Sequence, residues 1–272
     1  MSGLQRAGRW LSEHAVLGIG IAVLVYMFIP IAVVVAMSFN TPPSKNSYSF
    51  GSFTLDNWTN PCGPAGMCDA VVRSVQIGVL ATIGATVLGT LMAFALVRHT
   101  FSGRTAANLV IFLPMASPEI VMGSSLLALF VATGFGGQLG FWTILIAHIM
   151  FCLSFVVVTV KARLTGMDSR LEQAAMDLYA NEWQTFWRVT FPLVFPGILG
   201  AALLAFSLSF DDFIITNLNA GNTTTFPMYV WGVAQRGVPM QVNVIGTVMF
   251  VVSIAIVLGA ELNRRRQEKA LA

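Results

Sequence analysis

The chain has 272 residues, of which 56% are hydrophobic and only 10% are charged, and its formal net charge is +3. A soluble domain carries about 25% charged residues, so this composition predicts a membrane protein and argues against a soluble one. The small net charge gives no indication of a nucleic-acid partner, so we expect none.

Six apolar segments are long enough to cross a membrane as helices, for which about 18 residues are needed. The predicted spans cover residues 15–38, 70–97, 106–133, 139–160, 197–218 and 242–262. The first is longer than the apolar core of a signal peptide and lacks a clear cleavage site, so we expect it to be retained. The predicted fold class is an all-α membrane protein with six transmembrane helices.

Positive charges predict the orientation, because cytoplasmic loops are enriched in Lys and Arg. With the N-terminus inside, twelve of the fifteen Lys and Arg residues fall on cytoplasmic segments, and only Lys45, Arg73 and Arg236 fall outside. Both termini are therefore predicted to be cytoplasmic. The expected organisation is a cytoplasmic segment 1–14, a membrane domain 15–262 with a long cytoplasmic loop 161–196, and a cytoplasmic tail 263–272.

The two long outer segments differ in character. Residues 39–69 are rich in Pro, Asn, Ser and Gly, which is typical of a surface loop. Cys62 and Cys68 in this loop either form a small disulfide or remain two free thiols. Residues 220–241 are more apolar in their middle and predict a short interfacial or re-entrant helix near Tyr229 and Trp231. No Cys/His cluster in the sequence suggests a metal site.

Two prolines interrupt the third span, in the stretch FLPMASPEIVMG. Proline removes a backbone donor and clashes with the preceding turn, so Pro114 and Pro118 predict a kink or break near Glu119. The Glu119 carboxylate would then lie at membrane depth. It would either face a solute or satisfy the backbone groups that the kink exposes.

The cytoplasmic loop 161–196 has the features of a structured segment. Ser169 is a candidate N-cap, with Glu172 three residues on as its capping-box partner, for a helix over about 170–179. A second helix over about 182–190 is expected to end before Pro192. The apolar side chains of these helices lie either against lipid alone or against a protein partner.

This loop resembles the EAA loop of the permease subunits of ABC importers. The family pattern is Glu-Ala-Ala, three residues, Gly, nine residues, Ile, one residue, Leu-Pro. Here the same spacing runs from Gln173-Ala174-Ala175 through Tyr179 and Val189 to Phe191-Pro192. Tyr179 in place of the glycine leaves the conformation of the turn open. The resemblance implies that a cytoplasmic ATPase docks on Glu172, Gln173, Ala174, Ala175, Asp177, Tyr179 and Pro192.

The fifth span carries two adjacent acids in the stretch LSFDDFIITN. A carboxylate at membrane depth costs roughly 2.5–3.5 kcal/mol, so intramembrane acids are usually functional. On one continuous helix, Ser207, Asp211, Asp212 and Thr216 form a polar stripe. With Glu119, and without a Lys or Arg in the membrane core, this stripe predicts a path for a cation. Either aspartate can instead cap a helix break or hydrogen-bond a neighbouring subunit.

Aromatic side chains near these acids suit a cation that has a methylene body, through ion pairs and cation–π contacts. The candidates are Phe210, Phe213, Phe226, Tyr229 and Trp231. Tyr and Trp at these positions are equally typical of residues that anchor a helix at the membrane interface. The three histidines are scattered, and His14, His99 and His148 are expected to be solvated or hydrogen-bonded structural residues and not ligands.

The stretches FSLSFDDFIITNLNAG and LPMASPEIVMG are similar to the spermidine/putrescine group of these permeases. The resemblance implies transport of a polyamine in a bacterial cytoplasmic (inner) membrane, by a multi-pass subunit. It also implies two ATPase chains, a second and distinct permease chain, and an extracytoplasmic substrate-binding protein.

No phosphate-binding loop of the type G-x-x-x-x-G-K-[ST] occurs, so ATP and Mg are expected on the partner ATPase, with no cofactor in this chain. Catalytic motifs are also lacking, so the chain is not expected to be an enzyme. Two other functions are open: a permease of the same class for another small solute, and an ion-coupled secondary transporter.

Overall fold

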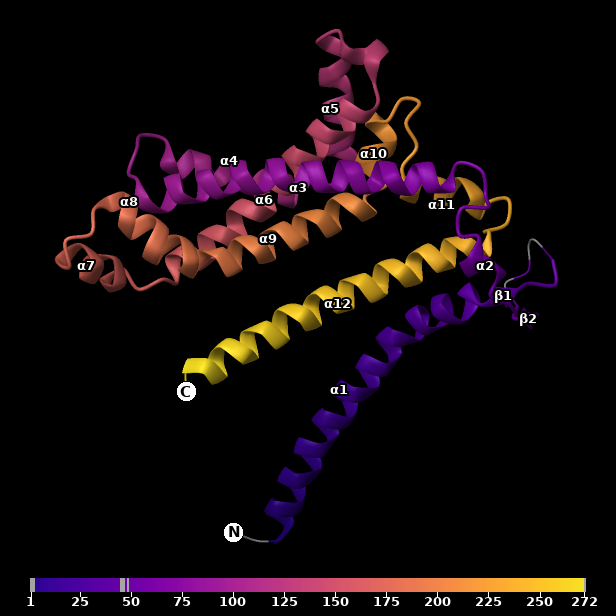
Figure 1. Cartoon of the computed structure of the whole chain (residues 1–272), viewed down its shortest axis with the longest axis horizontal. Helices are drawn as coiled ribbons and strands as arrows, with labels where there is room; N and C mark the ends of the chain where they lie inside the picture. Colours follow the sequence, from indigo (N-terminus) through magenta and orange to yellow (C-terminus); the bar gives the residue numbers. More distant parts are fainter. Residues whose placement is uncertain (1–2, 45–46, 48, 272) are drawn as a thin grey trace. The chain divides into compact units, whose positions relative to one another are not determined.

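The computed structural model describes the backbone of residues 3–44, 47 and 49–271, and the side chains of 15–44, 47, 49–259 and 262. The chain forms two compact units. One comprises the two ends of the chain, up to Ala65 and from Gly232, and the other comprises Gly66–Trp231. Figure 1 shows the elements of each unit.

The unit formed by the chain ends contains two long helices, α1 (Gly3–Ser38) and α12 (Met240–Leu271). They pack against each other, with the rings of Phe28 and Phe250 edge to face at 6.4 Å between centroids. Between them in sequence come the strands β1 (Asn40–Thr41) and β2 (Ser52–Phe53), which pair antiparallel, and the short helix α2 (Asp56–Thr59).

A buried amide holds the segment after α1 to the end of that helix. Asn57 donates from Nδ2 to the carbonyl oxygens of Ser38 and Asn40, at 3.2 and 3.0 Å. The ring of Phe39 stacks between those of Phe53 and Trp58, with centroid distances of 5.7 and 5.3 Å. The loop is therefore ordered by specific contacts, although its sequence shows no helical period.

The second unit is built on three packed helices, α3 (Met67–Arg98), α6 (Phe141–Thr165) and α9 (Phe191–Asp211). Small residues on α3, including Ala81, Ala85 and Ala93, are fully buried. Small side chains let helices approach closely, which supplies the packing that drives helix association in a membrane. At Gly89 an added Cβ would lie 2.7 Å from Cγ1 of Val156 on α6.

Shorter elements complete this unit. They are α4 (Arg104–Ala116), α5 (Glu119–Ala132), the 3₁₀ turn η1 (Phe135–Gln138), α7 (Arg170–Asp177), α8 (Glu182–Thr185), the π-helical turn η2 (Phe186–Thr190), α10 (Ile214–Asn219) and α11 (Phe226–Ala234). The last three residues of α11, from Gly232, belong to the other unit. The predicted short helix near Tyr229 and Trp231 is confirmed as α11.

Five helices among the described residues are long and apolar enough to cross a membrane. They are Ala15–Ser38, Met67–Arg98, Phe141–Thr165, Glu182–Asp211 and Met240–Gly259. The third predicted span is a broken pair, α4 and α5, bent by 109°. The predicted break is confirmed, since α4 ends at Ala116 and Pro118 immediately precedes α5, where its fixed φ is compatible with a helix start.

Two predictions about the fifth span were wrong. The helix does not stop before Pro192, because a π-type turn precedes it and the Phe191 amide donates to the carbonyl of Phe186, five residues back. Proline is tolerated in the first turn of the helical segment that follows. The span is also not continuous over 197–218, because α9 ends at Asp211 and α10 begins at Ile214.

The close approach of α3 and α6 predicts that Gly89→Ala destabilises the protein by roughly 1–3 kcal/mol, since the new methyl group overlaps Val156. Gly200→Ala in α9 is the matched control, because no atom lies within 4 Å of a Cβ there. Thermal unfolding in detergent or nanodiscs measures both. A midpoint for Gly89→Ala at or above that of Gly200→Ala would contradict the packing.

Candidate functional site

The break between α9 and α10 is the centre of the candidate site. Asp212 leaves the helical conformation, with φ −64° and ψ 128°, and the chain resumes as α10 two residues later. Its carboxylate caps the new helix: Oδ1 accepts from the Ile215 amide at 3.4 Å, and Oδ2 accepts from the amide and the hydroxyl of Thr216, both at 2.8 Å. Asp212 therefore supplies acceptors that the first turn of a helix otherwise lacks.

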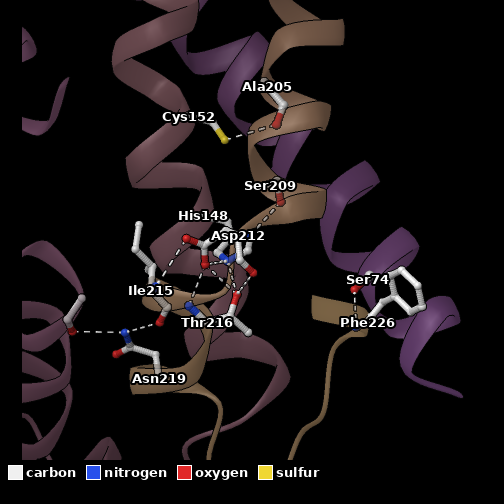
Figure 2. Close-up of polar contacts among 11 residues, drawn as sticks. Ser74, His148, Cys152, Ala205, Ser209, Asp212, Ile215, Thr216, Asn219 and Phe226 are labelled. Atoms are coloured by element: carbon white, nitrogen blue, oxygen red, sulfur yellow. Dashed lines mark hydrogen bonds and ion pairs between the residues drawn. The ribbon is translucent and has the colours of Figure 1, made fainter. Parts of the chain in front are cut away.

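His148 on α6 contacts both sides of this break (Figure 2). Its Nδ1 lies 2.7 Å from the Ser209 hydroxyl on α9, and its Nε2 lies 2.8 Å from the Thr216 hydroxyl on α10. Nε2 is also 3.4 Å from Oδ2 of Asp212. All four side chains are buried. Of the two expected roles, solvated or hydrogen-bonded, His148 has the second.

The break divides the predicted polar stripe. Ser207 and Asp211, one helical turn apart on α9, are exposed, whereas Asp212 and Thr216 are buried against α6. The prediction of one continuous stripe on one helix was wrong, because Asp212 turns inward to cap α10. Of the two aspartates, only Asp211 presents its carboxylate at the surface of the unit.

A second buried side chain joins α10 to the broken third span. Asn219 donates from Nδ2 to the carbonyl oxygens of Gly123 on α5 and Ile215, at 3.2 and 2.9 Å. An added Cβ at Gly123 would meet Cδ1 of Leu218 at 2.8 Å, so this glycine permits the contact of the two helices. Glu119 lies at the exposed start of α5, and its carboxylate has no hydrogen-bond partner among the described residues.

Aromatic rings lie near Asp211. Phe210, which precedes it, has its ring 5.9 Å from that of Phe206 and 6.3 Å from that of Phe226. The rings of Phe213 and Trp231 are 5.2 Å apart, and Trp231 is exposed. Four of the five predicted aromatic residues thus take part in ring contacts: Phe210, Phe213, Phe226 and Trp231. Tyr229 is half-buried on α11.

The predicted coupling residues lie on a second feature, the segment from α7 to η2, except Pro192, which lies in the first turn of α9. We call the α7–η2 segment the coupling segment. Gln173, Ala174, Asp177, Tyr179 and Pro192 are exposed, and Glu172 and Ala175 are half-buried. Leu178, Tyr179 and Trp183 form the apolar part of this surface and are 82%, 98% and 70% exposed. The C-terminal end of α3 and this segment border a cleft of about 990 Å³, whose lining includes Phe94, Arg98, Glu172, Trp183 and Phe186.

Glu172 links the coupling segment to α3 and does not complete a capping box. Its Oε1 accepts from Nη2 of Arg98 at 2.6 Å and from the Thr190 hydroxyl at 2.5 Å. The predicted Ser169–Glu172 box was therefore wrong, and Ser169 makes no side-chain capping bond. A capping box occurs instead at the start of α8, where Asn181 and Gln184 exchange hydrogen bonds of 2.8 and 3.1 Å.

Tyr179 adopts the backbone conformation of the glycine that it replaces. Its φ is +64°, and Ala180 donates its amide to the carbonyl of Ala175 at 3.1 Å, which closes the end of α7. It is the non-glycine residue with positive φ among those described. A residue with a Cβ pays roughly 1–2 kcal/mol for the left-handed region. The turn between α7 and α8 is thus present, with local strain.

The structure also shows the state of the three cysteines. Cys62 and Cys68 are disulfide-bonded, one of the two alternatives open from the sequence, and Cys152 is a buried free thiol. The Cys152 thiol donates to the carbonyl of Ala205 at 3.4 Å, one turn from His148 on the same face of α6. This contact joins α6 to α9 without touching the break.

Comparison with known proteins identifies the class. The family described as "Binding-protein-dependent transport system inner membrane component" matches residues 85–267, and the chain belongs to this family. The fold agrees: a solved bacterial ABC transporter that imports the polysaccharide alginate has a TM-score of 0.64 at 15% identity, over 94% of this chain and 97% of that chain. The chain is therefore a multi-pass permease of the ABC-importer class.

The particular relatives are permeases named for polyamines. The chain is 36% identical to the spermidine/putrescine transport system permease protein PotC of Haemophilus influenzae, over 90% of this chain and 94% of the relative. It is 35% identical to PotC of Escherichia coli, with 91% and 93% coverage. It is 34% identical to the putrescine transport system permease protein PotI of Escherichia coli, with 82% and 81% coverage. The resemblance inferred from the sequence is confirmed.

The strain at Tyr179 predicts that Tyr179→Gly stabilises the turn by about 1 kcal/mol relative to Tyr179→Ala, since both remove the ring and only glycine removes the Cβ penalty. The difference in unfolding free energy between these two variants measures it. Equal stabilities would show that the positive φ at this position costs nothing.

Proposed function

We propose that the chain is one permease subunit of an ATP-driven importer and that its solute is a polyamine such as spermidine or putrescine. The observation that carries the proposal is the exposed Asp211 carboxylate, flanked by Phe210 at a helix break and one turn from the exposed Ser207. The names of the relatives in the PotC and PotI groups support the choice of solute.

Asp211 suits an ammonium group that passes along the surface of the unit. An ammonium–carboxylate hydrogen bond is roughly twice as strong as a neutral one, and an aromatic face attracts a cation within about 6 Å. The methylene segments of a polyamine match the aromatic side chains beside the carboxylate. Glu119 is exposed at the start of α5, with no hydrogen-bond partner among the described residues, and is a second candidate carboxylate for the same path.

The proposed assembly contains three kinds of partner: ATPase chains, a second permease chain and a binding protein. Two ATPase chains bind ATP and Mg and dock on the exposed residues of the α7–η2 segment. A second, distinct permease chain completes the path beside Asp211, and an extracytoplasmic binding protein delivers the solute. Both termini and the coupling segment face the cytoplasm of a bacterium, which agrees with the distribution of Lys and Arg along the chain.

The proposed mechanism is alternating access, in which the path opens to one side of the membrane at a time. Closure of the ATPase chains moves the coupling segment, and the path opens toward the binding protein. ATP hydrolysis then returns the path to its starting state. Asp211 and the aromatic rings hold the cation in the path only transiently, because a carrier must bind its solute weakly enough to release it. The coupling segment and Asp211 lie at the two ends of the helical segment Glu182–Asp211.

Uptake of labelled spermidine by the assembled complex in vesicles, with and without ATP on the cytoplasmic side, tests the class of mechanism. We expect uptake to require ATP. Uptake that persists without ATP and follows an ion gradient would instead indicate a secondary transporter. Competition by other solutes in the same vesicles tests the choice of a polyamine.

Removal of the exposed charge tests the path. Asp211→Asn is expected to reduce spermidine uptake roughly tenfold or more, because a hydrogen bond to a charged group contributes about 1.5–3 kcal/mol. Asp56→Asn, which removes an exposed carboxylate from α2 in the other unit, is the control. Normal uptake by an assembled Asp211→Asn complex would exclude this carboxylate from the path.

A further inference from the structure

The α9–α10 break is surrounded by a closed set of buried polar side chains. His148, Ser209, Asp212 and Thr216 are 1%, 4%, 8% and 0% exposed, and each has a hydrogen-bond partner within the set. Polar groups at membrane depth are costly unless they are paired, so an arrangement that pairs all four is strongly favoured over others. The set therefore specifies one geometry for the break.

His148 is the member that joins the two halves of the broken span. Its two ring nitrogens lie 2.7 and 2.8 Å from hydroxyls on opposite sides of the break, Ser209 in the last turn of α9 and Thr216 in α10. The planar imidazole keeps these two contacts at a fixed separation. The direction in which α9 ends, and with it the direction of the exposed Asp211 side chain, is thereby fixed from α6.

The same scaffold extends to α5. Asn219, fully buried at the end of α10, donates to the carbonyl of Gly123, and Thr143 on α6 donates its hydroxyl to the carbonyl of Asn219 at 2.7 Å. Since Gly123 lies one turn into α5, this contact also locates the start of that helix, where Glu119 is exposed. Figure 2 shows Asn219 and its bond to the carbonyl of Ile215.

We propose that His148 is a positioning residue for the cation path. It does not contact the solute. Together with Ser209, Asp212 and Thr216 it fixes the helix break that presents Asp211, and through α10 and Asn219 it holds α5 in register. This inference rests on the proposed function, in which Asp211 contacts the cation. It assigns Asp212 to the buried scaffold and leaves Asp211 as the aspartate of the path.

The test uses the assembled complex in vesicles, with spermidine uptake and ATP hydrolysis measured together. Ser209→Ala removes one arm of the scaffold with little change in volume, and His148→Phe removes both. We expect uptake to fall about five- to tenfold in either variant, with ATP hydrolysis within about twofold of the unchanged protein. His148→Gln, whose amide both donates and accepts, should restore part of the uptake.

Cys152→Ala is the matched control. It removes a buried polar contact between α6 and α9 one turn from His148, with no contact to the break, so uptake should be unchanged. A purely structural role for His148 would lower the amount of assembled complex and would affect uptake and hydrolysis in parallel. If His148→Phe does not assemble, Ser209→Ala and His148→Gln still give the two readouts.

Orientation can be read directly at Ser207, which is exposed on the same face as Asp211. In a Cys152→Ala background, a cysteine introduced at position 207 is labelled by a membrane-impermeant thiol reagent. We expect Ser209→Ala to change the labelling rate by at least about threefold, because the end of α9 is no longer fixed. An unchanged rate, together with unchanged uptake, would overturn the proposal.

A double variant separates this proposal from the proposed function. If Ser209 acts through Asp211, Asp211→Asn with Ser209→Ala should transport no worse than Asp211→Asn alone, whereas independent effects would multiply. Impaired transport by Asp211→Asn with normal transport by Ser209→Ala and His148→Phe would refute the positioning role only. Normal transport by Asp211→Asn would refute the path itself.

Discussion

A polar group that these helices carry into the apolar region must find its partner within the protein, because lipid offers none. The bonds of His148 to Ser209 and Thr216, and of Asp212 to the first turn of α10, meet this requirement at the one place where the fifth span is broken. The break is thus a stable element of the fold. Because of the break, Asp212 is buried with hydrogen bonds to its carboxylate, while the adjacent Asp211 is exposed.

The opposite end of the helical segment Glu182–Asp211 is held by a different kind of contact. Glu172 accepts from Arg98 and from Thr190, and so joins α7 to α3 and to the turn that leads into α9. An exposed ion pair contributes little, but this carboxylate is only 15% exposed and has a second partner, which makes its geometry specific. The coupling segment is therefore attached to the helix that carries Asp211 by side-chain bonds as well as by the chain itself.

Much of this architecture follows from local sequence, and the parts that do not have long-range causes. Apolar length located the spans, and Pro118 located the break before α5, because both effects act within a few residues. The sequence around the break at Asp212, LSFDDFIITN, contains no proline or glycine that would predict it. It depends on His148, whose contacts are 61 and 68 residues away in sequence. Glu172 likewise leaves its expected capping partner for Arg98, 74 residues away. The Asn181–Gln184 box was readable from the sequence and was missed.

The two polar clusters also bear on how a movement could pass through the unit. Helix α9 has 21 residues, or about 30 Å at 1.5 Å per residue, and it packs against α3 and α6. The N-terminal end of α9 follows the π-type turn η2, and such turns are often found at functional sites. The C-terminal end of α9 is the α9–α10 break, which His148 on α6 holds through Ser209 and Thr216. A displacement of the coupling segment would therefore be absorbed at η2 or near Pro196, or be passed along α9 to the α9–α10 break. Since Asp211 is the last residue of that helix, it lies where such a displacement would change its surroundings most.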